Sequence, residues 1–171
     1  MEQHIDQVRK VFKKSGFNDK DIYRLASVLS RLEAEVGSSK CWNVGDVQVL
    51  DKAFTTSHAY HPCYKGKNVN PLVLAIYNIF PDEENGEVML IRKSICKNYH
   101  CMNPRHLFYG DHIDLKIEKW KRKGVNIDKN KYTKVLWMYK NNSKSMSYRK
   151  IANEFDLNYN VVRSICNYER S

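Results

Sequence analysis

Three side chains able to bind a soft metal ion lie close together near the middle of the chain. Cys96, Cys101 and His106 are spaced with four residues between each neighbouring pair. Zinc is commonly held by four thiolate or imidazole ligands in a tetrahedron, and such a closed site is structural. The Asn103-Pro104 pair favours a rigid turn that would direct His106 towards the metal. The fourth ligand must come from elsewhere, and the candidates are Cys41, Cys63 and His61.

A second pattern, near the end of the chain, is typical of a helix-turn-helix. Ile151, Ala152, Val162 and Ile165 recur at helical spacing, and Asp156 stands in the turn, where a residue that tolerates the left-handed region is needed. The second helix then presents five polar side chains on its outer face: Tyr159, Asn160, Arg163, Ser164 and Asn167. Arg, Asn and Ser are side chains that read base edges in the major groove. The alternative is a plain helical hairpin with a solvated polar face.

The excess positive charge lies almost entirely in the last third of the chain. The whole chain has 29 Lys and Arg against 19 Asp and Glu, a formal net charge of +10. Residues 116–171 hold 14 of these basic and 5 of these acidic residues, a net of +9. This asymmetry is typical of a segment that binds a polyanion, and a solvated basic tail is the alternative. Phosphate contacts are expected from Lys116, Lys119, Lys121, Arg122 and Lys123, with Trp120 as a packing anchor.

Composition excludes several other classes of protein. Apolar residues make up 42% of the chain and charged residues 28%, which is globular composition. The longest apolar run, residues 72–77, is far too short to span a membrane, and the sequence shows no secretory signal. Five cysteines without an export signal favour metal ligation or buried thiols over a disulfide framework. We therefore expect a cytoplasmic protein, associated with the nucleoid of a bacterial cell.

Two helices are expected within residues 1–37, where they must pack against the rest of the protein. The first carries an apolar stripe, and the second begins at the N-cap Asn18 and stops at Gly37. The two stripes consist of Ile5, Val8, Val11 and Phe12, and of Ile22, Leu25, Leu29, Leu32 and Val36. Two heptads are few for a coiled coil, so packing onto the body of the protein is favoured.

The remaining sequence predicts an α+β fold in four parts. These are a helical segment (1–37), a metal-bound core (38–115), a basic linker (116–126) and a helix-turn-helix domain (127–171). The core is expected to hold a β-like segment over Val44–Phe54, a buried helix from Asn70-Pro71 to Phe80, and a strand over Val88–Ile91. On its sheet, Gln48 and Lys52 are expected to contact DNA. In the last part, a helix after Asp128 precedes two short helices over Ser147–Phe155 and Asn158–Tyr168.

The cysteine pattern resembles that of the zinc-containing His-Me finger (HNH, His-Cys box) homing endonucleases. The resemblance rests on Cys41-Trp42, Cys96, Cys101, Asn103-Pro104, His106-Leu107 and Gly110, and it covers about residues 38–116. It implies that Cys41 is the fourth ligand of a structural Zn²⁺. It also implies a ββα-metal core whose helix begins near Asp111. Small helix-turn-helix modules often follow the nuclease core in phage members of this family.

Two departures from the family pattern bear on catalysis. The family carries a catalytic His two residues before the first Cys of the loop, where this chain has Ser94. It carries a metal-binding Asn nine residues after the ligand His, where this chain has Leu115. A serine hydroxyl alone is a poor general base, and leucine cannot bind a hard cation. The alternative is an active endonuclease whose metal site is rearranged around His112 and Asp114.

These features together favour a sequence-specific double-stranded DNA-binding protein that does not cleave its site. The expected role is transcriptional repression or occlusion of a DNA site, in a phage, a phage satellite or another mobile element. The resemblance also implies a homodimer on a pseudo-palindromic site. A third class, a protein-binding antagonist that uses the helix-turn-helix as a scaffold, is disfavoured by the net +9 of residues 116–171.

Overall fold

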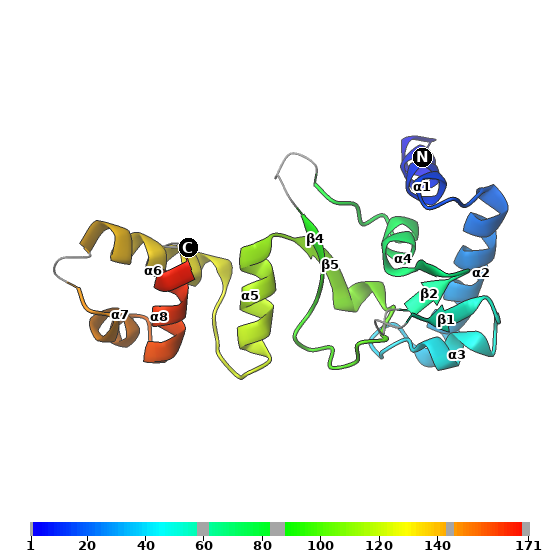
Figure 1. The fold of residues 1–171 in the computed structure, drawn as a ribbon. Coiled ribbons are helices and arrows are strands. Elements are labelled where there is room, and N and C mark those ends of the chain that lie inside the picture. The colour runs from blue at the N-terminus through cyan, green and yellow to red at the C-terminus, as the bar shows by residue number, and fades with distance from the viewer. Residues whose placement is uncertain (1, 58–61, 83–87, 143–145, 169–171) are drawn as a thin grey trace. The chain divides into compact units, whose positions relative to one another are not determined.

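The computed structural model describes residues 2–57, 62–82, 88–142 and 146–168, and it mixes helices with small sheets (Figure 1). The α+β class expected from the sequence is therefore confirmed. The chain divides into two compact units, residues 1–112 and 113–171. Each unit has its own cluster of buried apolar side chains, and each is described by itself below.

The first unit begins with two helices, α1 (Glu2–Lys14) and α2 (Asp19–Val36). Asn18 caps α2 because its side chain accepts hydrogen bonds from the backbone amides of the first turn, and Gly37 follows the helix with a φ of 92°. Leu25, Leu29 and Leu32 are buried in the core of the first unit. The apolar stripe of α2 therefore packs onto the body of the protein, as expected.

The segment after α2 differs from the prediction. Val44–Phe54 was expected to be β-like, but α3 (Val44–Gln48) is helical. Val44 and Val47 are buried one helical turn apart, and the Asn43 amide donates to the Asp46 carboxylate at the start of the helix. The strands come later and form an antiparallel sheet in the order β1 (Phe54–Thr56), β2 (Pro62–Tyr64) and β3 (Lys67–Asn68).

The helix predicted after Asn70-Pro71 is present but short. It is α4 (Asn70–Ile76), and it contributes Leu72 and Val73 to the core. It does not continue to Phe80, because the chain turns at Tyr77 and Asn78 adopts a left-handed φ of 60°. β4 (Met89–Arg92) lies within one residue of the predicted strand and pairs antiparallel with β5 (Leu107–Gly110).

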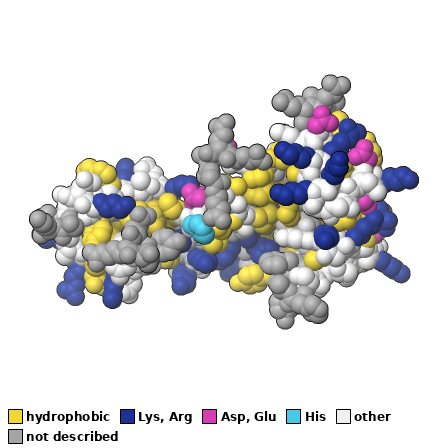
Figure 2. Space-filling view, turned by 45° about the horizontal axis from the view of Figure 1, so that its top comes forward, with side chains coloured by type: hydrophobic (Ala, Val, Ile, Leu, Met, Phe, Trp, Pro, Cys, Tyr) yellow, Lys and Arg dark blue, Asp and Glu magenta, His cyan; other side chains and the backbone are white. Residues whose placement is uncertain are grey.

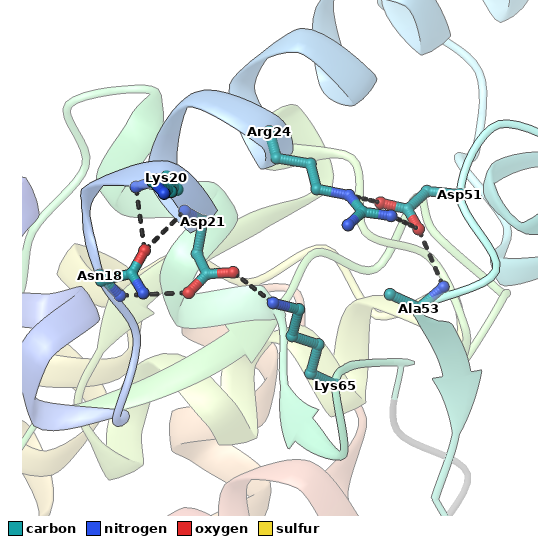
Figure 3. Close-up of polar contacts among 7 residues, drawn as sticks. All are labelled: Asn18, Lys20, Asp21, Arg24, Asp51, Ala53 and Lys65. Atoms are coloured by element: carbon teal, nitrogen blue, oxygen red, sulfur yellow. Dashed lines mark hydrogen bonds and ion pairs between the residues drawn. The ribbon is translucent and has the colours of Figure 1, made fainter.

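Two buried aspartates join α2 to the segments around the three-stranded sheet (Figure 3). The Asp51 carboxylate accepts two hydrogen bonds from the Arg24 guanidinium, at 2.6 and 2.8 Å, and one from the Ala53 amide at 2.9 Å. The Asp21 carboxylate lies 2.5 Å from the Lys65 ammonium. These ion pairs hold together chain segments that are distant in sequence.

The second unit consists of helices only, within its described residues. They are α5 (His112–Lys121), which starts at the last residue of the first unit, α6 (Lys129–Asn142), α7 (Tyr148–Glu154) and α8 (Tyr159–Tyr168). Residues 116–121 of the predicted basic linker are thus helical, at the end of α5. Asp156, between α7 and α8, has a left-handed φ of 48°, as the turn requires.

Candidate metal centre and nucleic-acid surface

Four side chains from distant parts of the first unit meet at one point. Cys41, Cys96, Cys101 and His106 place one ligand atom each within 4.8 Å of all the others. The Cys41 Sγ lies 3.6 Å from the Cys96 Sγ and 3.7 Å from the His106 Nδ1. The Cys101 Sγ lies 3.4 Å from the same Nδ1. This is the ligand set that the sequence and the family resemblance together indicated.

Three of the six distances between these ligand atoms match a tetrahedral zinc site, and all six are within 4.8 Å. With Zn–S near 2.3 Å and Zn–N near 2.0–2.1 Å, the edges of the tetrahedron measure about 3.7 Å between sulfurs and about 3.5 Å between sulfur and nitrogen. The separations of 3.4–3.7 Å in this cluster lie close to both values. Three thiols and one imidazole are also soft and borderline donors of the kind that zinc prefers.

Of the other two candidates for the fourth ligand, the structure describes only Cys63, and Cys63 does not join this cluster. Cys63 is buried in β2 and is not part of the four-residue group. His61 lies outside the described residues. Among the residues that the structure describes, no second cluster of three or more potential ligands is found.

Asn103 holds the segment that carries Cys101 and His106 against the segment that carries Cys41. Its fully buried side chain donates to the carbonyls of Ser38 and Lys40, at 2.8 and 2.6 Å, and accepts from the Arg105 amide. The backbone amide of Met102 donates to the carbonyl of Trp42. Sequence reasoning assigned Asn103-Pro104 to a turn but missed this bridging role, because backbone carbonyls leave no sequence signal.

Burial disfavours the thiolate form of two cysteines in the cluster. Burial raises the pKa of the Cys101 thiol to about 12, and burial also raises the pKa of the Cys41 thiol. A metal ion would offset this cost by binding the thiolates directly. His106 turns its Nδ1 towards the thiols and would bind a metal ion through it, and its Nε2 lies 3.2 Å from the Ser39 carbonyl, which orients the ring.

Comparison with known proteins gives no relative to argue from. No family model, curated protein or solved structure matches this chain significantly. Among the described residues, no helix is long and apolar enough to cross a membrane. Function is therefore inferred from the side chains themselves.

The positions that bear on catalysis lie at the end of β4 and on α5. Ser94 follows β4 and is half-buried. Leu115 lies on α5 and is also half-buried. His112 is exposed, and the Asp114 carboxylate lies 3.0 Å from the Lys129 ammonium. Within the described residues, neither His112 nor Asp114 belongs to a group of potential metal ligands.

A basic groove of about 520 Å³ lies in the second unit. Its lining joins two surfaces that the sequence suggested separately, the basic stretch on α5 and the outer face of α8. The lining residues are Lys116, Lys119, Trp120, Lys123, Ser164 and Asn167. Trp120 does pack, with its ring 6.0 Å from that of Tyr132, and it also forms part of the groove wall.

The remaining predicted contacts of the second unit are exposed, with differing local partners. Asn160 and Arg163 lie exposed on α8. Tyr159 is 40% exposed, and its ring meets that of Tyr148 edge-on. Lys121 is exposed but pairs with Glu118 at 3.2 Å. Neither Lys121 nor Arg122, which is also exposed, lines the groove.

The two DNA contacts predicted in the first unit are not on a sheet. Gln48 ends α3, and its side-chain amide donates to the Phe54 carbonyl at 2.7 Å, which ties the helix to β1. Lys52 is exposed in the turn between them. The prediction that Gln48 and Lys52 contact DNA from a β-sheet was therefore wrong, because Gln48 lies in a helix and Lys52 in the turn that follows it. On the face drawn in Figure 2, basic side chains nevertheless lie over both units, and acidic ones are few.

Proposed function

We propose that this protein binds double-stranded DNA in a sequence-specific manner and acts as a transcriptional repressor or site-occluding factor. The observation that carries the proposal is the groove in which two lysines of α5, and Lys123 just after it, meet the exposed polar face of α8. Lysines supply affinity for phosphates, whereas the exposed polar residues of a second helix supply base contacts in the major groove. In a solvated basic tail, the lysines would not be expected to lie beside the polar face of a folded helix.

The position of each residue relative to the groove suggests which part of the DNA it would contact. Lys116, Lys119 and Lys123 would contact phosphates, which position the protein on DNA without reading sequence. Asn160 and Arg163 would read base edges, since both are exposed on α8 and do not line the groove. Ser164 and Asn167 lie on the outer face of α8 and also line the protein's basic groove. They would contact the sugar-phosphate backbone of DNA at the edge of its major groove.

The metal in this proposal is a structural zinc ion. Cys41, Cys96, Cys101 and His106 would use all four tetrahedral positions, so no position would remain for water or substrate. The zinc would join a segment before α3 to the loop between β4 and β5, in addition to the hydrogen bonds that Asn103 and Met102 make to that segment. Its contribution is to folding and not to catalysis.

The proposed origin is a homing endonuclease that has lost its catalytic residues. Ser94 and Leu115 stand where the family carries its general base and its metal-binding amide. A protein that keeps the DNA-binding surface and loses cleavage would occupy a site without cutting it. Binding as a homodimer would match the two-fold symmetry of a pseudo-palindromic site.

Selection of binding sites from a pool of random duplexes tests the proposal. The wild-type chain should enrich one sequence motif. Arg163→Ala should lose preference at one position and bind the selected site about 1–3 kcal/mol more weakly, which is the cost of a lost base contact. Lys119→Ala should weaken binding to selected and random duplexes alike and reduce the salt slope by about one.

Lys121→Ala is the matched control, because it removes the same charge from the same helix. Lys121 pairs with Glu118 and lies outside the groove, so its loss should affect binding less than the loss of Lys119. Equal losses for Arg163→Ala on specific and random duplexes would show that α8 does not read sequence.

A further inference from the structure

The loop that carries three of the metal ligands has a charge unlike the rest of its unit. Residues 92–106, called the metal loop below, contain Arg92, Lys93, Lys97 and Arg105 and no Asp or Glu. The rest of residues 1–112 contains 11 Lys and Arg against 13 Asp and Glu. The metal loop is therefore a positively charged segment within a unit that is otherwise close to neutral.

The metal loop also exposes two large apolar side chains. Ile95 is 73% exposed and Tyr99 is 67% exposed. Lys97, between them in sequence, is exposed, as is Arg105. Exposed Ile and Tyr side chains among basic residues, with no acidic residue in the segment, are typical of a surface that binds nucleic acid. The basic residues attract its phosphates, and the apolar side chains pack against its sugars and bases.

The backbone around Tyr99 is held firmly, so its side chain is presented in one place. The Arg92 guanidinium donates to the Tyr99 carbonyl at 2.6 Å and lies 5.7 Å from the centre of the Tyr99 ring. The Asn98 side chain accepts from the His100 amide at 2.8 Å, and its carbonyl accepts from the Cys101 amide at 3.3 Å. A contact made by such a preorganised side chain costs little ordering entropy.

We propose that the metal loop is a second contact with duplex DNA, made in the minor groove. Lys97 and Arg105 would meet phosphates, and Ile95 and Tyr99 would pack against the sugars and the edge of a base step. Apolar wedges among basic residues are the side chains that minor-groove proteins use, and they need no base-specific hydrogen bonds. The proposal rests on the proposed function, because it assumes that duplex DNA is the partner.

The test uses the full, zinc-loaded chain and its selected duplex, with 2-aminopurine placed at successive base steps outside the part protected by the second unit. Ile95→Ser with Tyr99→Ser should raise Kd about tenfold and abolish the change in 2-aminopurine fluorescence at one step, since apolar side chains inserted in the minor groove partly unstack the base step that they contact. Lys97→Ala should reduce the salt slope by about one. Tyr23→Ser is the matched control, because Tyr23 is 70% exposed on α2 of the same unit and should change neither quantity.

Zinc content and the circular dichroism spectrum establish that each variant is folded. Unchanged affinity, salt slope and fluorescence in the metal-loop variants, with intact binding by the wild type, would overturn this inference and leave the proposed function standing. A loss confined to single-stranded probes would also overturn it. Absence of duplex binding by the wild type would instead overturn the proposed function.

Discussion

Cys101 and His106 owe their positions to residues that are not ligands. Asn103 is fully buried between them and bonds to the backbone on both sides of the cluster, and Ser39 fixes the imidazole through its carbonyl. A metal ion bound here would therefore meet an oriented set of donors. The cluster would stabilise the first unit as a whole, because its members come from segments more than fifty residues apart.

Replacing a ligand should unfold the first unit. Cys101→Ser or His106→Ala should abolish zinc binding and remove the contribution of the buried Trp42 to the near-ultraviolet circular dichroism spectrum, since structural zinc contributes on the order of 10 kcal/mol to the folding of small modules. Elemental analysis should find one zinc per wild-type chain. Cys63→Ala is the control: this cysteine is buried but outside the cluster, so its loss should leave the zinc content unchanged. Well-folded wild-type protein without zinc would contradict the assignment.

At the residue scale, the sequence identified the members of the Cys₃His cluster but not every residue of the proposed DNA-binding surfaces. Ligands are predictable because zinc selects residue types, and Cys96, Cys101 and His106 lie within one short segment. The exposure of Ile95 and Tyr99 left no such signal, since an apolar residue in a loop is as often buried. The role of Gln48 depends on a hydrogen bond to Phe54, which exists only once the unit is folded.

Among the elements, helices were predicted better than strands. Asn18, Gly37 and Ser147 mark helix ends through local hydrogen bonds or backbone angles, which depend on sequence alone. Val44–Gln48 failed because its apolar spacing fits a strand and a single helical turn equally well. The capping box of Asn43 and Asp46 was the signal that could have decided for the helix.

The two aspartate pairs of Figure 3 make the stability of the first unit sensitive to acid. Hydrogen bonding from Lys65 lowers the pKa of Asp21. Burial alone would raise the pKa of Asp51, but the hydrogen bonds from Arg24 and the Ala53 amide and the charge of Arg24 together lower it. A carboxyl group whose folded pKa is lowered stabilises the fold above its unfolded pKa of about 3.9, and this contribution is lost as pH falls through the lowered folded pKa.

Asp51→Asn should therefore lower the unfolding midpoint at pH 7, and its difference from wild type should shrink as pH falls below about 4. Chemical denaturation between pH 3 and pH 7 measures this. Asp6→Asn removes an exposed carboxylate on α1, 74% exposed, and should leave the acid limb of the curve unchanged. A difference between Asp51→Asn and wild type that stays constant down to pH 3 would show that the ion pair adds nothing to stability.

Substitutions at Asp156 test the backbone conformation of the turn between α7 and α8. Its φ of 48° is left-handed, so a β-branched residue there is strained. Asp156→Val should destabilise the second unit by about 1–2 kcal/mol and weaken DNA binding, because α8 would lose its position relative to α5. Asp156→Gly should keep both properties within experimental error. Thermal unfolding followed by circular dichroism compares the two, and equal behaviour would contradict the conformation of the turn.

At the scale of the whole molecule, the distribution of charge separates two kinds of surface. The second unit concentrates lysines beside a polar helix face, whereas the first unit is nearly neutral apart from its metal loop. The positive charge of the second unit could be predicted because its basic residues fall within one continuous part of the sequence, residues 116–171. The groove itself was not predictable, since its walls come from α5 and α8, which are distant in sequence and meet only in the folded unit.

The most direct test of the account compares binding and cleavage of the selected duplex in one experiment with Mg²⁺ present. The zinc-loaded chain should bind that duplex at least about 10³-fold more tightly than random duplexes of the same length, the lower end of the range for specific DNA-binding proteins. The duplex recovered from the complex should be intact, because Ser94 and Leu115 supply neither a general base nor a metal ligand. Equal affinity for both duplexes would contradict sequence-specific binding. Metal-dependent cleavage of the bound duplex, abolished by His112→Ala, would instead show that the protein is an active endonuclease.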